Sequence, residues 1–137
     1  MIHTKHSIRV RYAETDPMKY VYYGHYAQYL EVARVELFRS LGISYDEIEK
    51  QGVWLPVSEY QIKYLKPARY DQLLEIHTRI RTKPGVRITF DYEIFNEERE
   101  KLTEAQVTLY FFDAEKQKII RCPTFLNQLI EKHWKEE

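Results

Sequence analysis

The stretch Arg11–Leu41 reads RYAETDPMKYVYYGHYAQYLEVARVELFRSL, and it determines the fold more than any other part of the chain. Its second half carries apolar residues at spacings of four, three, four and four positions. These residues are Tyr26, Leu30, Ala33, Leu37 and Leu41. Such spacing places them on one face of an α-helix, so we predict an amphipathic helix over residues 26–41.

An acidic turn, Glu14-Thr15-Asp16-Pro17, precedes this helix. Asp before Pro is common in turns, so one interpretation of Asp16 is structural. A carboxylate just before a helix start also lies where unpaired backbone N–H groups point. That geometry suits activation of water, or direct attack, beside a site that stabilises negative charge. Asp16 is therefore the leading candidate for a catalytic residue.

Downstream of this helix, the hydrophobic pattern changes from helical to strand-like. Gly42 suits a helix C-terminal cap, and Ser44 with Glu47 forms a capping-box pattern. Apolar residues then alternate with polar ones, which is typical of strands with one buried face. The further elements that we expect are a first strand at 7–12, a short helix at 45–51, strands at 74–80, 86–94 and 105–111, and a last helix at 124–135.

These elements predict an α+β fold, in which an antiparallel sheet of five or six strands wraps around one long helix. A helix with one broad apolar stripe can be covered by a curved sheet that is apolar on one face. The chain has 137 residues and 44% apolar content, which suits a single domain over residues 1–137.

The composition argues against several classes of function. The 21 basic and 21 acidic residues give a formal net charge of zero, so no overall field attracts nucleic acid or an anionic membrane. No apolar run approaches the roughly 18 residues of a membrane span. The N-terminus lacks the apolar core of a secretory signal, and the single Cys122 excludes an internal disulfide. We therefore expect a cytoplasmic protein.

The sequence indicates no metal or cofactor. Its five histidines, at positions 3, 6, 25, 77 and 133, lack zinc-ligand spacing. There is no glycine-rich phosphate loop and no G-x-S-x-G elbow. Cys122 adjoins no histidine motif and is expected to be a packing residue. Glu14 is expected to be a turn acid. A two-carboxylate glycosidase mechanism is not indicated, since the sequence ties no second acid to Asp16.

Two motifs resemble those of hotdog-fold acyl-CoA thioesterases of the 4-hydroxybenzoyl-CoA type. The first is D-P-M-x-x-V-Y-Y-G-x-Y at 16–26, followed on the helix by E-V-A-R-x-E-L at 31–37. The second, KYLKPARYD at 63–71, is similar to the family's K-Y-x-x-P-A-R-Y-D. The resemblance implies a hotdog fold and hydrolysis of acyl-CoA to a free acid and coenzyme A. It also implies a homodimer or homotetramer with the active site at a subunit interface.

The resemblance further implies roles for individual residues. Asp16 matches the aspartate that, in relatives, either attacks the thioester carbonyl or acts as a general base. Tyr23 occupies the position whose backbone N–H binds the carbonyl oxygen. Many bacterial relatives carry histidine at that position, so a histidine-assisted mechanism is not expected here. His25 stands where relatives more often carry asparagine, and it could cap the helix, orient Asp16 or contact the substrate.

Two further pairs of residues bear on the substrate. Lys19 and Tyr20 replace a glycine and a small aliphatic residue of relatives, and they could narrow the acyl pocket or add a positive charge. Lys83 and Arg87 lie at the turn near which relatives bind the nucleotide, and both side chains suit phosphate groups. We expect this pair to bind coenzyme A.

Two alternative functions stay open at this point. The chain could be a non-catalytic hotdog domain that binds acyl-CoA or a protein. It could also be a thioesterase that acts on acyl-carrier protein, whose acidic surface would favour a positive patch around the pocket mouth.

Overall fold

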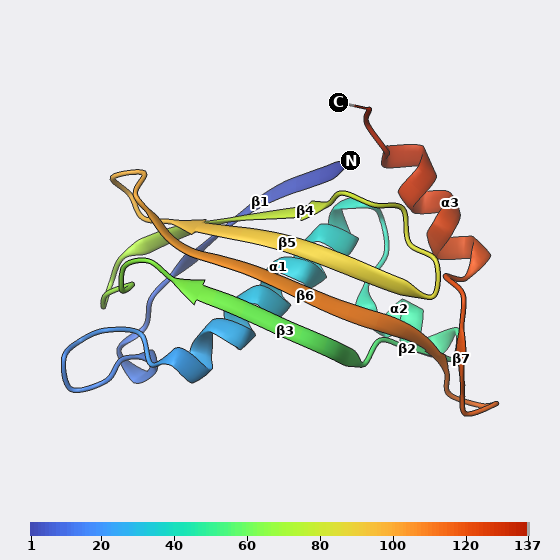
Figure 1. The fold of residues 1–137 in the computed structure, drawn as a ribbon, viewed down its shortest axis with the longest axis horizontal. Helices are drawn as coiled ribbons and strands as arrows, with labels where there is room; N and C mark the ends of the chain where they lie inside the picture. Colours follow the sequence, from blue (N-terminus) through green and yellow to red (C-terminus); the bar gives the residue numbers. More distant parts are fainter. Residues whose placement is uncertain (137) are drawn as a thin grey trace.

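One long helix lies across an antiparallel sheet in the computed structural model, which describes residues 1–136 (Figure 1). The helices, of which the two labelled η are short 3₁₀ helices, are η1 Tyr12–Glu14, η2 Tyr23–His25, α1 Tyr26–Ser40, α2 Tyr45–Lys50 and α3 Thr124–His133. The strands are β1 Ile2–Arg9, β2 Val53–Trp54, β3 Val57–Tyr64, β4 Leu73–Ile80, β5 Arg87–Phe95, β6 Lys101–Asp113 and β7 Lys118–Ile120.

The sheet is built around β6, the longest strand. The strand order is β1-β4-β5-β6, and β2, β3 and β7 also pair with β6, with every pairing antiparallel. The expected count of five or six strands is wrong, because the described residues form seven. The short strands β2 and β7 account for the difference, since the 13-residue β6 continues past β3 and pairs with both.

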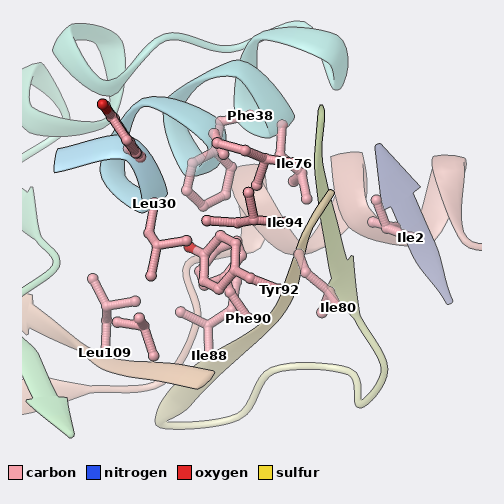
Figure 2. Close-up of a cluster of buried hydrophobic side chains, with 14 of the residues drawn as sticks. Ile2, Leu30, Phe38, Ile76, Ile80, Ile88, Phe90, Tyr92, Ile94 and Leu109 are labelled. Carbon is pink, nitrogen blue, oxygen red and sulfur yellow. The ribbon is translucent and has the colours of Figure 1, made fainter. Parts of the chain in front are cut away.

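The concave face of the sheet packs against the apolar stripe of α1. Leu30, Ala33 and Leu37 are buried, as the spacing predicted. Figure 2 shows Leu30 and Phe38 from α1 in one cluster with isoleucine and aromatic side chains of β4 and β5. The rings of Phe38 and Phe90 meet edge to face, with centroids 5.7 Å apart. The predicted α+β architecture, a curled antiparallel sheet around a central helix, is confirmed.

The ends of the helices follow the local sequence signals. α1 ends one residue before the predicted boundary, and Gly42 follows with a φ of 97°, a conformation that favours glycine. Ser44 and Glu47 form the predicted capping box of α2. Among the helices of residues 1–136, none combines the length and the apolarity that a membrane span requires.

Other boundaries also differ from the sequence prediction. The strand predicted at 105–111 is longer, since β6 spans Lys101–Asp113. The first strand is not 7–12 but Ile2–Arg9, because the Arg11 N–H donates to the Glu14 carboxylate and the chain turns into η1. Val86 is exposed, because β5 begins only at Arg87. The last helix ends at His133, two residues earlier than predicted.

Replacing Leu37 by alanine should destabilise the fold by about 2–5 kcal/mol, since the side chain is completely buried and a cavity would remain. Val32→Ala on the exposed side of the same helix should change the free energy of unfolding by less than about 0.5 kcal/mol. Urea denaturation measures both values. Equal effects of the two substitutions would contradict the packing described above.

Candidate active site

A hollow of about 650 Å³ opens between the loop before α1 and the end of β3. In Figure 1 this region lies at the left of the view, where the loop approaches the tip of the β3 arrow. Asp16 lines the hollow, together with five tyrosines. These are Tyr20, Tyr22, Tyr23, Tyr26 and Tyr64. Asp16 thus borders a space whose walls are mainly aromatic and aliphatic.

The Asp16 carboxylate is anchored through one of its two oxygens. Its Oδ1 accepts hydrogen bonds from the Met18 N–H at 2.8 Å and the Tyr20 N–H at 3.2 Å. The Asp16 N–H donates to the Tyr20 carbonyl at 2.8 Å, which closes the loop. No group among residues 1–136 donates to Oδ2. One oxygen therefore holds the side chain in place, and the other is available for chemistry.

The start of the helix supplies unpaired donors at the same hollow, which Tyr23 also lines. The Tyr22 N–H donates to the Glu14 carbonyl at 2.9 Å, and the His25 N–H donates to the Tyr22 carbonyl in the first helical turn. Tyr23 and Gly24 lie in the sequence between Tyr22 and His25, and their N–H groups are left free within the described residues. The start of a helix leaves such donors unpaired and carries partial positive charge. The Tyr23 ring itself is largely exposed, so its backbone is the part that suits the hollow.

Gly24 allows the backbone at the helix start to lie close to the Tyr22 ring. A Cβ atom at Gly24 would lie 2.8 Å from the Tyr22 ring, which is closer than real Cβ contacts. A side chain here would push Tyr22 away from the helix start, and the wall of the hollow would move with it.

The two sequence motifs meet at this site. The Val21 N–H donates to the Ala68 carbonyl at 2.8 Å, and the Tyr70 N–H donates to the Lys19 carbonyl at 2.9 Å. These bonds clamp the first motif onto the segment 63–71. The similarity of both motifs to one family therefore has a structural reason, since together they shape one loop.

Glu14 is the functional candidate that the sequence did not reveal. Its side chain is buried, and Oε1 accepts hydrogen bonds from the Arg11 N–H and the Tyr29 hydroxyl, both at 2.8 Å. Burial by itself would raise the pKa of Glu14, but these two bonds and the Arg11 guanidinium outweigh it and lower the pKa below its usual value. Burial, followed by the bond to Glu14, raises the pKa of Tyr29.

The residues flanking Asp16 divide between the hollow and the surface. Tyr20 lines the hollow, and the Arg69 guanidinium lies 4.7 Å from the centroid of its ring. Lys19 adopts a φ of 67°, and its ammonium lies over the Tyr12 ring, 4.3 Å from the centroid. This arrangement agrees with the expectation that Tyr20 narrows the pocket. The positive charge of Lys19, in contrast, is directed to the Tyr12 ring and not to the hollow.

His25 lies at the helix start but faces a helix neighbour. Its Nδ1 is 3.0 Å from Gln28 Oε1, and its ring meets the edge of Tyr22 with centroids 6.1 Å apart. Of the described residues, those that line the hollow do not include His25. Contact with a substrate stays a prediction for this residue, and the geometry agrees better with a local structural role.

Lys83 belongs to the turn between β4 and β5, and Arg87 is the first residue of β5. This turn lies at the opposite end of the sheet, near α3 on the right of Figure 1. Lys83 Nζ is 3.1 Å from Glu131 Oε2, an ion pair with both side chains about half exposed. Arg87 pairs with Tyr110 of β6, whereas the hollow lies where β6 pairs with the end of β3 at Thr103. Thr103 and Tyr110 are seven residues apart on β6, which corresponds to about 24 Å of strand. Within a single chain, Lys83 and Arg87 are therefore far from Asp16.

Among residues 1–136, no group of three or more His, Cys, Asp or Glu side chains is arranged to hold a metal ion. Burial raises the pKa of the Cys122 thiol to about 12, which disfavours the reactive thiolate.

Comparison with known proteins identifies a family. Residues 18–103 match the model of the thioesterase superfamily. The Bacillus subtilis protein YneP is 41% identical over 93 residues, which are 68% of this chain and 67% of that protein. The Escherichia coli acyl-CoA thioester hydrolase YbgC is 34% identical over 111 residues, 81% of this chain and 83% of that protein. The DHNA-CoA thioesterase structure from Staphylococcus aureus aligns with a TM-score of 0.90 at 34% identity, covering 96% of this chain and 91% of that chain.

Replacing Glu14 by glutamine should weaken the dependence of stability on acid pH. Because the pKa of Glu14 is lowered on folding, its stabilising contribution is present above its ordinary value of 4.5 and is lost as pH falls through the folded value. Urea denaturation from about pH 7 to about pH 3 should show a shallower loss in Glu14→Gln than in the wild type. Glu115→Gln in an exposed turn is the control. An unchanged slope in Glu14→Gln would contradict the assigned network.

Proposed function

Because the chain belongs to the thioesterase superfamily, we propose that it hydrolyses an acyl-CoA thioester to a free acid and coenzyme A, with Asp16 as the catalytic residue. The observation that carries the proposal is the shared hollow, in which the Asp16 carboxylate and the helix start at Tyr23 line the same space. The name of the Escherichia coli relative, an acyl-CoA thioester hydrolase, supports the reaction class.

The free oxygen of Asp16 can act by either of two routes. As a general base, it takes a proton from water while the water oxygen attacks the thioester carbon. As a nucleophile, it attacks that carbon itself and forms a mixed anhydride, which water then hydrolyses. In both routes the carbon–sulfur bond breaks, and coenzyme A leaves as a thiolate that takes up a proton.

The backbone N–H of Tyr23 is proposed to bind the carbonyl oxygen as it becomes negative. A free N–H at the helix start combines a hydrogen bond with the partial positive charge of the helix. Losing one such donor typically costs about 2.7–4 kcal/mol of transition-state stabilisation. The Tyr23 N–H would then bind the oxygen of the carbonyl group, and Asp16 would act at its carbon.

The side chains that line the hollow favour some acyl groups over others. Tyr26 is buried, its hydroxyl accepts a hydrogen bond from the Ala68 N–H at 3.3 Å, and burial raises its pKa. Together with Tyr64 it offers a neutral aromatic surface, with ring centroids 5.1 Å apart. Such walls favour an aryl or medium-length acyl group, which buries apolar area against the rings.

We further propose that the active form is a homodimer, or a homotetramer built from such dimers, joined through β3. Among the described strands, β3 pairs only with β6, so its other edge is unpaired. Val57, Tyr60 and Tyr64 on this strand are exposed. An unpaired edge with exposed apolar side chains suits pairing with another chain. A twofold axis would place two copies of β3 antiparallel to each other.

This pairing would bring Lys83 and Arg87 to the site of the neighbouring chain. In an antiparallel pair, the Tyr64 end of one β3 lies beside the Val57 end of the other. Val57 pairs with Leu109, next to Tyr110, which pairs with Arg87. Three strand spacings, about 15 Å, would then separate Arg87 from the hollow of the other chain. The pantetheine arm and diphosphate of coenzyme A can bridge such a gap.

Asp16→Asn should lower turnover of acyl-CoA by about 10²–10⁴-fold if Asp16 is a general base, and by more if it attacks directly. Substrate binding should survive, because the amide keeps the shape of the side chain and removes a negative charge. Release of free thiol from a panel of acyl-CoA and acyl-carrier-protein substrates measures turnover. Near-wild-type turnover of the variant would contradict a catalytic role for Asp16. No turnover of any substrate by the wild type would favour a binding domain without catalysis.

Replacing both Lys83 and Arg87 by alanine should raise KM for acyl-CoA while kcat changes little. Phosphate contacts hold the ground state and the transition state equally, so their loss acts as a loss of uniform binding. A short thioester without the nucleotide is the control substrate, and its KM should hardly change. Equal losses on both substrates would show that the two side chains support the fold instead.

Mixing two defective variants should restore activity if sites form between chains. Asp16→Asn and the Lys83→Ala/Arg87→Ala double variant are unfolded together, refolded and assayed well below the wild-type KM. Random pairing into dimers should give about one quarter intact sites, so activity should exceed the mean of the two separate variants. Sedimentation of the wild type should show a dimer or larger at micromolar concentration. A monomer, or no gain on mixing, would contradict the shared site.

A further inference from the structure

The buried carboxylate of Glu14 lies two residues before Asp16 and has no part in the chemistry proposed above. Its side chain is 5% exposed and accepts four hydrogen bonds. The Tyr29 hydroxyl and the Arg11 N–H bind Oε1, and the Arg11 guanidinium binds Oε2 at 3.0 and 3.2 Å. A carboxylate bonded at both oxygens has no free position for water or substrate, so its role must lie in what it holds.

Glu14 connects the two halves of the candidate site. Through its side chain it binds Tyr29, the fourth residue of α1, at 2.8 Å. Through its main-chain carbonyl it accepts the Tyr22 N–H at 2.9 Å, one residue before the Tyr23 N–H. Asp16 follows two residues along the chain. The same residue therefore holds the base of the Asp16 loop to both the helix start and the helix body.

We propose that Glu14 and Tyr29 are positioning residues, which set the distance from the Asp16 carboxylate to the Tyr23 N–H. This inference rests on the function proposed above. A displacement of about 1 Å, caused by a change away from the reacting atoms, can cost about 100-fold in rate. The loop ends at an exposed tip around Lys19, and backbone bonds hold it to segment 63–71. The buried bond between Glu14 and Tyr29 adds a restraint at the base of the loop, toward α1.

The ionisation states of the pair favour a lasting bond. The lowered pKa of Glu14 keeps its carboxylate charged, and the raised pKa of Tyr29 keeps its hydroxyl protonated. The hydroxyl donates and the carboxylate accepts, which makes a charge-assisted hydrogen bond in a buried setting.

Tyr29→Phe tests the proposal, because it removes one oxygen atom and keeps the ring. We expect kcat for acyl-CoA to fall about 10- to 100-fold while KM stays within about threefold, since the walls of the hollow remain. Tyr92→Phe is the matched control. Tyr92 is also buried, and its hydroxyl accepts a bond from Arg34 at 3.3 Å, away from the hollow. This control should lower the melting temperature to a similar extent and leave kcat unchanged.

A double-variant comparison separates positioning from general support of the fold. In an Asp16→Asn background there is no carboxylate to position, so adding Tyr29→Phe should lower the residual turnover by less than about twofold. An equal fold-loss in both backgrounds would overturn the proposal, and so would wild-type kcat in Tyr29→Phe alone. Should Tyr29→Phe not fold, Glu14→Gln takes its place in the same comparison.

The failures of the two proposals are distinguishable. If Asp16→Asn keeps full turnover, the proposed catalytic role of Asp16 fails, and the positioning role fails with it. If Asp16→Asn is inactive and Tyr29→Phe has wild-type kcat, only the positioning role fails.

Discussion

The structure depends on the burial of one apolar stripe of α1 against the concave face of the sheet. Leu30 and Leu37 on this stripe are fully buried. Burying each side chain of this size contributes roughly 1.5–3 kcal/mol. Because the stripe can face the sheet in only one rotation of the helix, the helix start is held beside the end of β3. The unpaired N–H groups of that start, and the loop before it, are placed by this packing.

Two carboxylates of the acidic turn have opposite surroundings. Glu14 is buried and bonded at both oxygens, whereas Asp16 is bonded only at Oδ1 and lines an open hollow. A bonded carboxylate holds chain segments together, and one with a free oxygen can take a proton or attack a carbonyl carbon. Their separation by two residues lets a single turn supply both the support and the reactive group that we propose.

The sequence predicted the parts of the fold that depend on local pattern. The helix over residues 26–41 was predictable because its apolar spacing is regular, and the α2 boundary because Ser44 and Glu47 form a local capping pair. The role of Glu14 was not, since its partner Tyr29 is brought to it by the long-range packing of α1. The distance of Arg87 from Asp16 likewise depends on strand register, which no single segment specifies.

The hollow is proposed to hold a thioester carbonyl between Asp16 and the Tyr23 N–H. A crystal structure with an acyl-CoA analogue, in which a ketone and a methylene group replace the thioester, measures this directly. We predict a carbonyl oxygen about 2.7–3.1 Å from the Tyr23 nitrogen. The Asp16 carboxylate should lie about 3–3.5 Å from the carbonyl carbon, or reach it through one water molecule. A ketone bound outside the hollow, or one with Asp16 directed away from it, would contradict the account.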